Sequence, residues 1–286
     1  PIRLEKTVSH VLARHRNFYG TLTVTEGRQN DRSLRTLTHG RIIHGQQYTD
    51  PARRRLPIAY YDENSGMGLA LARHPSRDPE TGDRSALKIG AIGLGVGTLA
   101  AYGQTGDTLR IYEINPDVVR LARSYFTYLR DTPARVEILP GDARLTLERE
   151  LQEHSPQAYD VFILDAFSSD AIPIHLLTME SMEIYWNHLK PTGVMAFHIS
   201  NRYFDLRPAI AALCRAKNLR CFFIRSLGDT ELGSFRAQWI LATQNEQVIE
   251  DLLNLSSSVC EDITTWPGTA WTDDYASLFF LVKKAK

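Results

Sequence analysis

One short segment, Lys88–Ala100, most constrains what this chain can fold into. It reads Lys-Ile-Gly-Ala-Ile-Gly-Leu-Gly-Val-Gly-Thr-Leu-Ala, an apolar strand that runs into a glycine-rich turn and then opens a helix. Gly93, Gly95 and Gly97 let the backbone turn tightly and approach a ligand closely. About 20 residues later, Glu113 ends the next apolar run, where its carboxylate can accept hydrogen bonds from both hydroxyls of a ribose. The segment therefore predicts a site for a nucleoside-containing cofactor.

From residue 86 onward the chain alternates strand-like apolar runs with helical stretches. The candidate strands lie at 87–93, 109–114, 135–139, 159–165, 193–199, 220–225 and 237–243. One helix has Asn115 as its N-cap and Pro116 at its first position, which is a common start signal. Such alternation predicts an α/β fold with a doubly wound, largely parallel, Rossmann-like sheet. Ligands of these sheets bind at the carboxyl ends of the strands, near the switch point.

Residues 1–82 have a different pattern. Short β segments such as 21–25 and 41–43 are separated by glycines, and no convincing amphipathic helix is visible. A polar stretch between Arg73 and Arg84 resembles a surface connection. We therefore expect a small N-terminal β domain over 1–82 and a Rossmann-like domain over 83–286.

The charge balance gives no overall attraction to nucleic acid or anionic lipid, because Lys and Arg number 33 and Asp and Glu also number 33. Residues 1–55 hold 11 of the basic residues, but no RNA-binding or DNA-binding motif accompanies them, so no nucleic-acid partner is expected. No apolar run approaches the roughly 18 residues needed to span a bilayer, so we expect a soluble chain.

The cysteines and histidines predict neither a disulfide framework nor a metal site. Cys214, Cys221 and Cys260 are odd in number and form no C-x-x-C pair, which favours a reducing compartment. No cluster of His, Cys and Asp has the spacing of metal ligands, so no metal is expected.

The identity of the cofactor depends on the acids that follow the strands. The turn alone is ambiguous, because 95–100 also satisfies the relaxed dinucleotide fingerprint and leaves NAD as an alternative. Asp142, in a Gly-Asp pair after the third strand, could accept a hydrogen bond from an adenine amino group, and Asp165 follows the fourth strand. Acids after strands two, three and four resemble the class I, S-adenosylmethionine-type Rossmann-like fold. S-adenosylmethionine or a relative is therefore favoured.

The segment Leu164–Thr178, Leu-Asp-Ala-Phe-Ser-Ser-Asp-Ala-Ile-Pro-Ile-His-Leu-Leu-Thr, resembles the gatekeeping loop of the spermidine synthases, or polyamine aminopropyltransferases. It looks most like the soluble domain of bacterial proteins in which such a domain is fused behind membrane-spanning segments. Further matching pieces lie at 40–46, 56–61, 198–202 and 272–275. The resemblance implies a small N-terminal β-sheet domain followed by a Rossmann-like catalytic domain.

The resemblance also implies a reaction and its residues. An amine attacks the carbon beside a sulfonium and displaces methylthioadenosine, with Asp165 as base or proton acceptor and Asp170 holding the amine in line. The sulfonium donor would contact Gly93, Gly95, Gly97, Glu113, Ile114, Asp142, Ala143 and Asp165. Gln46, Tyr60 and Tyr61 would bind the acceptor, and His44 and Gln47 could line the same cleft. Asp273, Asp274 and Tyr275 could close the site, whereas His198 reads as a buried structural histidine.

The resemblance carries implications beyond the site. The co-substrate would be S-adenosylmethionine or its decarboxylated form, without a metal, and the partner a small-molecule amine or none. Homodimers are common in the family. The expected location is cytoplasmic, with tethering to the inner membrane as the alternative if a longer parent protein carries a membrane-spanning portion.

One departure from the family pattern affects the donor. Spermidine synthases typically carry an aspartate in the glycine loop that pairs with the aminopropyl ammonium, and this chain has Val96 there. A donor that retains its carboxylate would be easier to seat beside valine than beside an aspartate, since two anions in a low-dielectric pocket repel. Plain S-adenosylmethionine, and transfer of a 3-amino-3-carboxypropyl group, are therefore candidates.

The predicted function is aminopropyl-type transfer to an amine with release of methylthioadenosine. Three alternatives stay open on the same fold. The first is a methyltransferase, which would release S-adenosylhomocysteine. The second is an acceptor-free enzyme that cyclises or cleaves S-adenosylmethionine, and the third is a non-catalytic nucleoside sensor.

Overall fold

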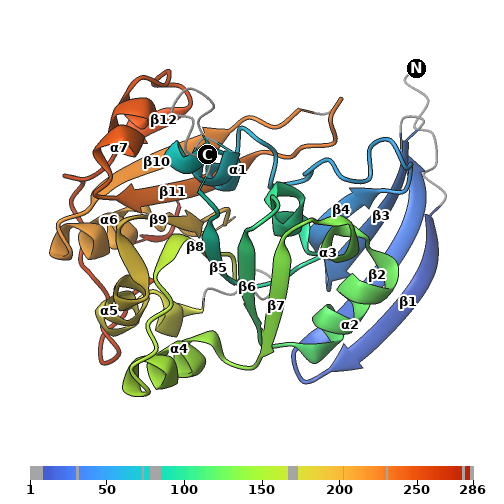
Figure 1. The fold of residues 1–286 in the computed structure, drawn as a ribbon, viewed down its shortest axis with the longest axis horizontal. Helices are drawn as coiled ribbons and strands as arrows, with labels where there is room; N and C mark the ends of the chain where they lie inside the picture. The colour runs from blue at the N-terminus through green and yellow to red at the C-terminus, as the bar shows by residue number, and fades with distance from the viewer. Residues whose placement is uncertain are drawn as a thin grey trace.

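The computed structural model describes residues 9–29, 32–72, 74–77, 85–166, 173–201, 203–229, 231–278 and 281–283. They form a small sheet and a large sheet that lie next to each other (Figure 1). The small sheet is antiparallel with its strands in chain order, β1 (Ser9–Asn17), β2 (Gly20–Gln29), β3 (Arg32–His39) and β4 (Ile42–Tyr48).

The large sheet has eight strands in the order β12-β10-β11-β9-β8-β5-β6-β7. Their bounds are β5 (Lys88–Ile92), β6 (Thr108–Glu113), β7 (Arg135–Pro140), β8 (Tyr159–Leu164), β9 (Leu189–His198), β10 (Arg220–Ser226), β11 (Ala237–Thr243) and β12 (Cys260–Asp262). After β5, the chain adds β6 and β7 on one side of β5, and β8 then pairs with the other side of β5. The switch point therefore lies between β5 and β8, which is where doubly wound sheets bind ligands.

Each of the seven predicted strands is present, and the α/β Rossmann-like fold is confirmed. The sheet is mixed rather than largely parallel throughout. β5 to β9 pair in parallel, whereas β11 is antiparallel to both β9 and β10, and β10 is antiparallel to β12. A short link from β10 to β11 suffices for this antiparallel pair, whereas parallel neighbours need a crossover.

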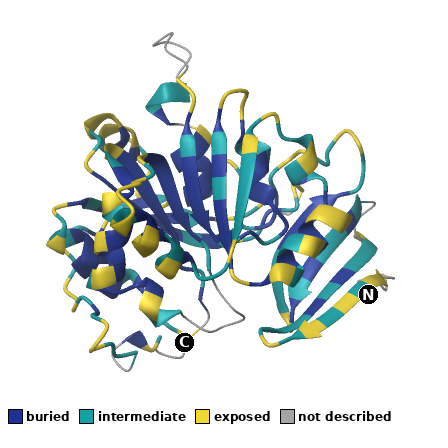
Figure 2. Ribbon diagram, turned by 60° about the horizontal axis from the view of Figure 1, so that its bottom comes forward, coloured by how far each residue is buried: buried dark blue, intermediate teal, exposed yellow. Residues whose placement is uncertain are grey.

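Helices cover both faces of the large sheet. They are α1 (Gly66–Ala72), α2 (Pro116–Tyr125), α3 (Tyr128–Asp131), α4 (Ala143–Gln152), α5 (Met179–Asn187), α6 (Arg207–Ala216) and α7 (Glu246–Leu253), with 3-10 turns η1 (Pro75–Arg77), η2 (Thr98–Tyr102) and η3 (Ile174–Leu176). Side chains alternate along each strand between the faces. Ile163 joins the core under α1, α2 and α7, while Phe162 and Leu164 join the core under α4, α5 and α6. Figure 2 shows the resulting layer of buried strands.

Helix α1 was not predicted. Its sequence, Gly-Met-Gly-Leu-Ala-Leu-Ala, has no polar face that would produce a helical period, and residues 66–71 are all buried. Gly66 permits this packing, because a Cβ there would overlap Trp239 of β11. Although α1 lies within 1–82, it contacts β8, β9, β10 and β11 of the large sheet. The domain boundary near residue 82 stays a prediction.

The small sheet is attached to α2 by side-chain hydrogen bonds. Asn17 Nδ2 donates to Asn115 Oδ1 at 2.7 Å and to Asp117 Oδ2 at 2.9 Å, and Arg35 donates to the Tyr125 carbonyl at 2.5 Å. Packing of α2 against β2 adds to these contacts. The attachment places β4 beside the glycine turn that follows β5, and the turn opens the 3-10 turn η2 rather than an α-helix.

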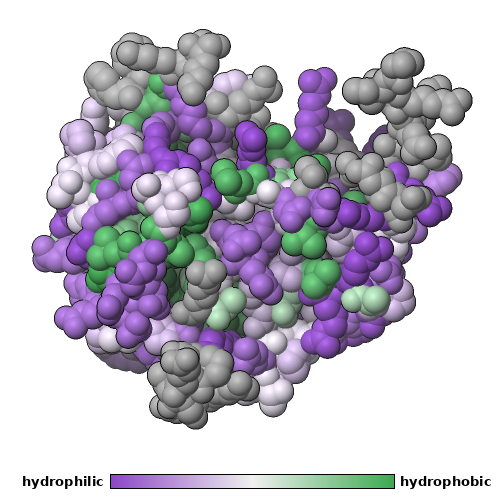
Figure 3. All heavy atoms as spheres, turned by 90° about the horizontal axis from the view of Figure 1, so that it is seen from above, coloured by the Kyte–Doolittle hydropathy of each residue, from purple (hydrophilic) through white to green (hydrophobic). Residues whose placement is uncertain are grey.

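On the face shown in Figure 3, apolar side chains form separate groups among hydrophilic ones. No helix in the parts of the chain that the structure describes has the length and apolar character to span a bilayer.

Candidate active site

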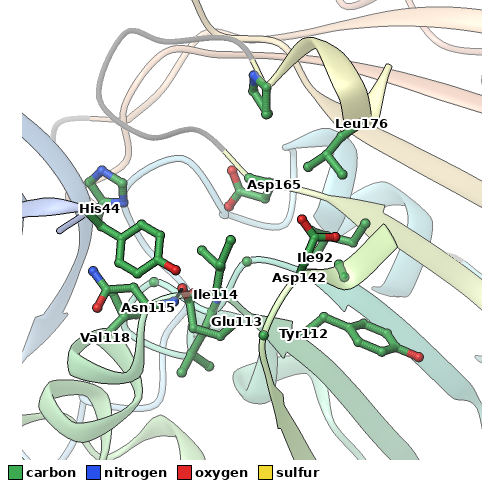
Figure 4. Close-up of a pocket in the computed structure, with 18 of the residues that line it drawn as sticks. His44, Ile92, Tyr112, Glu113, Ile114, Asn115, Val118, Asp142, Asp165 and Leu176 are labelled. Atoms are coloured by element: carbon green, nitrogen blue, oxygen red, sulfur yellow. Dashed lines mark hydrogen bonds between the residues drawn. The ribbon is translucent and has the colours of Figure 1, made fainter. Parts of the chain in front are cut away.

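A cavity of about 220 Å³ lies at the carboxyl ends of β5, β6 and β8, with β4 on its opposite side (Figure 4). Glu113, Asp142 and Asp165 all line it, so three acids from separate strand ends meet around one space. Gly93, Gly95, Ile114 and Ala143 line it as well. The structure therefore brings together the predicted donor-side residues, with Gly97 as the exception.

The glycines of the turn are needed for the backbone conformation and for close contacts with neighbouring backbone. Gly93 has φ +98°, and a Cβ there would overlap the Asp165 carbonyl oxygen. Gly95 has φ +54°, and its Cβ would lie 2.7 Å from the His44 carbonyl oxygen. Gly97 begins η2 and faces the Leu129 side chain instead of the described cavity lining. Glycine at 93 and 95 thus lets the turn pass between β8 and β4.

Glu113 is held in place by backbone donors. Its Oε2 accepts from the Leu94 N–H at 2.9 Å, and its Oε1 accepts from the Asn115 N–H at 2.8 Å. Burial raises the pKa of Glu113, these backbone bonds oppose the rise, and the nearby Asp165 charge adds to it. Each carboxylate oxygen has two acceptor positions, so both oxygens can still accept from a ligand hydroxyl.

Asp142 has a structural and a cavity-lining role at once. Its Oδ1 accepts from the Leu145 N–H at 3.0 Å and caps the N-terminus of α4. Its Oδ2 lies 3.9 Å from Nε2 of the half-exposed His175. Because the two oxygens face different neighbours, capping leaves one of them available at the cavity.

Asp165 is the centre of a hydrogen-bond network. Its Oδ2 accepts from the Tyr61 hydroxyl at 2.6 Å, and its Oδ1 lies 2.7 Å from His198 Nδ1. His198 Nε2 lies 2.8 Å from Ser200 Oγ, which accepts from the Gln238 N–H at 2.9 Å. These distances are compatible with an arrangement in which His198 donates from Nδ1 to the carboxylate and accepts from the Ser200 hydroxyl at Nε2.

The network keeps Asp165 ionised. Burial by itself would raise the pKa of Asp165, but His198, the Tyr61 hydroxyl and His44 together hold that pKa below its usual value. Burial and the Asp165 charge raise the pKa of Tyr61, so its hydroxyl stays protonated and donates. Asp165 is therefore a carboxylate at neutral pH.

His198 is a direct partner of Asp165, which the sequence interpretation missed. Its ring stacks on Trp239 with centroids 4.5 Å apart and an interplanar angle of 15°. Tyr60 and Tyr61 also pack near this ring, at centroid distances of 5.7 Å and 6.2 Å. A usable signal exists in the sequence, because His198 ends the strand parallel and adjacent to the one that precedes Asp165.

His44 is the second functional candidate whose environment the sequence did not reveal. It lines the cavity, and its Nε2 is a buried atom without a hydrogen-bond partner among the described residues. Burial, followed by the neighbouring His39, lowers the pKa of His44 to about 4, with Asp165 opposing the change. His44 is therefore neutral at physiological pH.

The predicted acceptor residues have mixed positions. Tyr61 reaches Asp165, but Gln46 donates to Thr36 Oγ1 at 2.9 Å within the small sheet and is absent from the described lining. Tyr60 is also absent from that lining, and its ring packs on Phe235. Asp170 lies outside the described residues.

Three other expectations concern the rim of the site. Gln47 bonds to the Thr127 backbone and side chain, so it joins β4 to the start of α3. Asp273 pairs with Arg144 at 2.5 Å and accepts from the Thr178 hydroxyl at 2.8 Å, a C-terminal connection to α4 and α5. Neither residue lines the cavity as described, and the same holds for Asp274 and Tyr275.

Val96 does not face the cavity as the sequence argument assumed. Its side chain is 1% exposed and is absent from the described lining. It packs against β4 so closely that a Cβ on Gly45 would lie 2.5 Å from Val96 Cγ2. The side chain at position 96 therefore acts on the contact between the turn and β4.

A second cavity, of about 560 Å³, is lined by Ser200 together with Arg225, Arg236 and Lys283. Arg225 is paired with Glu261 at 2.5 Å, and Lys283 donates to the Asn201 carbonyl at 2.6 Å. The Ser200 hydroxyl links this cavity to His198. Its basic lining makes it a poor site for a polycation.

No group of three or more His, Cys, Asp and Glu side chains in the described part of the chain is arranged to hold a metal ion.

Comparison with characterised sequences finds distant relatives, and no family model matches the chain. The polyamine aminopropyltransferase of Vibrio vulnificus is 29% identical over 188 residues, which cover 65% of this chain and 58% of that protein. The N-terminal histidine N-methyltransferase of Emericella nidulans is 27% identical over 195 residues, which cover 66% of this chain and 33% of that protein. The chain thus spans less than two thirds of either relative.

Solved structures show the same fold over nearly the whole chain. A probable spermidine synthase from Corynebacterium glutamicum aligns with a TM-score of 0.60 at 18% identity, covering 95% of this chain and 98% of that one. The spermidine synthase of Thermotoga maritima aligns with a TM-score of 0.53 at 15% identity, covering 92% and 81%. Polyamine aminopropyltransferases are thus among the distant relatives of the chain, and its two-sheet fold is the one seen in spermidine synthase structures.

Proposed function

We propose that the chain transfers a three-carbon group from an S-adenosylmethionine-type sulfonium donor to an amine and releases methylthioadenosine. The observation that carries this proposal is Asp165, a carboxylate at the end of β8 held by Tyr61 and His198, in the cavity that Glu113 and Asp142 share. A cationic sulfur beside an ionised Asp165 is electrostatically favourable.

Glu113 and Asp142 would bind different parts of the donor. Glu113 would accept from the ribose hydroxyls, and Asp142 would accept from the adenine amino group. Ile114, which is 45% exposed, and Ala143 would contact the faces of the base. An exposed apolar side chain at a cavity edge gains from covering an aromatic ring.

Asp165 would then act on the acceptor. The amine forms a new bond to the carbon beside the sulfonium, the carbon–sulfur bond breaks, and its electron pair stays on sulfur. The proton lost by the amine passes to the Asp165 carboxylate, while His198 keeps that carboxylate oriented. Since the leaving group departs neutral, positioning and exclusion of water would supply most of the acceleration.

The basic second cavity bears on the acceptor class. Arg236 and Lys283 lie on the side of Ser200 beside Arg225, whose charge is paired with Glu261, and these two charges would repel a polyamine extending in that direction. An acceptor with a single amine, or one that also carries an anionic group, fits these surroundings better than a polycation.

Methyl transfer is the second candidate, and the relative that is an N-terminal histidine N-methyltransferase supports it. In both reactions a nucleophile attacks a carbon bonded to the sulfonium sulfur. The two reactions differ only in whether that carbon belongs to the methyl group or to the three-carbon tail. Incubation with S-adenosylmethionine or its decarboxylated form, with and without amines, followed by mass spectrometry separates them. Methylthioadenosine supports the proposal and S-adenosylhomocysteine supports methyl transfer.

The remaining alternatives are tested in the same experiment. Methylthioadenosine formed from the donor alone would indicate an acceptor-free enzyme. Binding of the nucleoside without turnover of any donor, unchanged in Asp165→Asn, would indicate a sensor. If neither donor and not even methylthioadenosine binds, the nucleoside site itself is rejected.

A further inference from the structure

The position of His44 results from a defect in the small sheet. Thr38 of β3 pairs with Ile43, and the preceding Leu37 pairs with Gly45, so His44 is the extra residue of a β-bulge. Gly45 has φ +147°, which favours glycine. Bulges commonly re-aim a side chain beside a functional site. In Figure 4, His44 reaches into the cavity from the side of the small sheet.

The bulge leaves His44 with an unsatisfied nitrogen. Its Nε2 is buried and has no partner among the described residues, whereas the neighbouring His39 places Nε2 2.6 Å from the Tyr19 carbonyl. Buried polar atoms are nearly always hydrogen-bonded, so an exception beside a cavity calls for an explanation, and a group bound in the cavity is one. His44 is thus prepared to make one more hydrogen bond.

The charges around the cavity indicate what that group is. Glu113, Asp142 and Asp165 already offer three acids for a sulfonium and an ammonium, and the described lining contains no Lys or Arg. A ligand carboxylate would therefore depend on a neutral donor, and His39 uses its Nε2 on a backbone carbonyl. His44 Nε2, carrying the proton, is an available side-chain donor on this wall, which Tyr19 with its hydroxyl also lines.

We propose that His44 recognises the carboxylate of the donor's amino-acid tail, so that the donor is S-adenosylmethionine rather than its decarboxylated form. This inference rests on the proposed function and names its substrate. The transferred unit is then 3-amino-3-carboxypropyl. The acceptor nitrogen bonds to the tail carbon beside sulfur, that carbon–sulfur bond breaks with its electrons on sulfur, and the amine proton passes to Asp165.

Carboxylate binding should also take up a proton. Burial and the neighbouring His39 hold the pKa of His44 near 4, with Asp165 and His198 as the other charged or titratable groups acting on it. An anion against Nε2 favours the charged imidazolium and raises that pKa. S-adenosylmethionine binding is therefore expected to consume protons near pH 6, and binding of the decarboxylated donor is not.

Calorimetric titration of the wild type and of His44→Ala with three ligands tests the proposal. Against His44→Ala, S-adenosylmethionine should bind ~10-fold more weakly, because one charge-assisted hydrogen bond is lost. Affinities for decarboxylated S-adenosylmethionine and for methylthioadenosine, which lack the carboxylate, should change less than about twofold. Titrations in buffers of different ionisation enthalpy measure the proton uptake.

Two further variants keep the test decisive. His44→Gln retains an N–H donor and should recover part of the lost preference, and it serves if the alanine variant folds poorly. His175→Ala removes a half-exposed histidine at the other end of the cavity, beside Asp142, and should shift all three ligands alike.

The outcomes separate this inference from the proposed function. The role of His44 is overturned if His44→Ala weakens the affinities for both donors equally or weakens neither. It is also overturned if the wild type binds only the decarboxylated donor. Each of these results leaves the transferase proposal standing. Failure of the wild type to bind methylthioadenosine or either donor overturns the proposed function itself.

Discussion

The wall of the cavity built by the large sheet and the wall built by β4 satisfy their polar side chains in different ways. On the first wall, Glu113 and Asp142 accept backbone N–H groups, and Asp165 accepts from Tyr61 and His198. On the second, a bulge places His44, whose Nε2 has no hydrogen-bond partner within the described part of the chain. The acids of the first wall, the strand-end wall, all have partners within the protein, whereas the second, the β4 wall, has an unpaired nitrogen. This difference fits our proposal that the strand-end wall holds the nucleoside and the β4 wall selects its tail.

The largest expected effect is the loss of turnover in Asp165→Asn. The amide has nearly the same shape but neither the charge that attracts the sulfonium nor the basicity that accepts the amine proton. Methylthioadenosine release, measured by chromatography and mass spectrometry, should fall by ~10²–10⁴-fold. Binding of methylthioadenosine should remain within a few-fold, since in our proposal Glu113 and Asp142 hold the nucleoside. Turnover close to wild type would remove Asp165 from the chemistry.

The fit of the strand-end wall is tested by Gly93→Ala. The substitution forces alanine to φ +98° and drives its Cβ into the Asp165 carbonyl, which is backbone and cannot give way easily. The free energy of unfolding should drop by about 3 kcal/mol in urea titrations. Gly40→Ala is the matched control, because it has φ +59° with open space around it and should cost only about 1 kcal/mol. Equal losses would show that backbone strain, not the close approach to β8, sets the requirement for glycine.

The strand-end wall could be predicted because its geometry follows from chain order. Parallel strands joined by helices bring their carboxyl ends to one edge, so Glu113, Asp142 and Asp165 had to meet if the strands formed. The same reasoning would have placed His198 beside Asp165, since β9 is the next strand of that edge. The antiparallel pairing at the β12 edge of the sheet and the helix α1 were harder to predict. The direction of a strand is not visible in its hydrophobic pattern, and a wholly apolar helix shows no alternation of polar and apolar residues with a helical period.

The β4 wall could not be predicted from the sequence for a physical reason. The family resemblance implied Gln46 as an acceptor residue, with His44 as a further candidate for the same cleft, and on a regular strand residues 44 and 46 would lie on the same face. The bulge breaks the alternation, so that His44 lines the cavity while Gln46 bonds to Thr36. Val96 was misjudged for a related reason, since its contact with Gly45 depends on how β4 lies against the turn.

The pH dependence of stability should report the unsatisfied histidine. Because the folded pKa of His44 is about 4 and the unfolded value is 6.5, the unfolded chain binds a proton first as the pH falls. Stability is therefore lost between pH 6.5 and 4, by roughly 2–3 kcal/mol from this group. In urea titrations at pH 7 and 4.5, His44→Gln should lose less stability than the wild type over that interval. Identical losses would mean that His44 does not titrate abnormally.

The smallest expected effect concerns the support that His198 gives to Asp165. In His198→Gln the amide can still donate to Asp165 Oδ1, but the imidazole contribution that helps to hold the Asp165 pKa down is lost. The pKa of Asp165 should rise, because burial is then less opposed, and the acidic limb of the pH–rate profile should move to higher pH. At neutral pH kcat should fall by only ~10-fold, as expected for a positioning residue rather than a reacting group. His188→Gln is the matched control, since His188 is a buried histidine bonded to the Leu147 carbonyl away from the cavity lining. An acidic limb that moves equally in both variants would reflect general destabilisation. An acidic limb that moves only in His198→Gln would show that the ionisation of Asp165 depends on its neighbour at the end of β9.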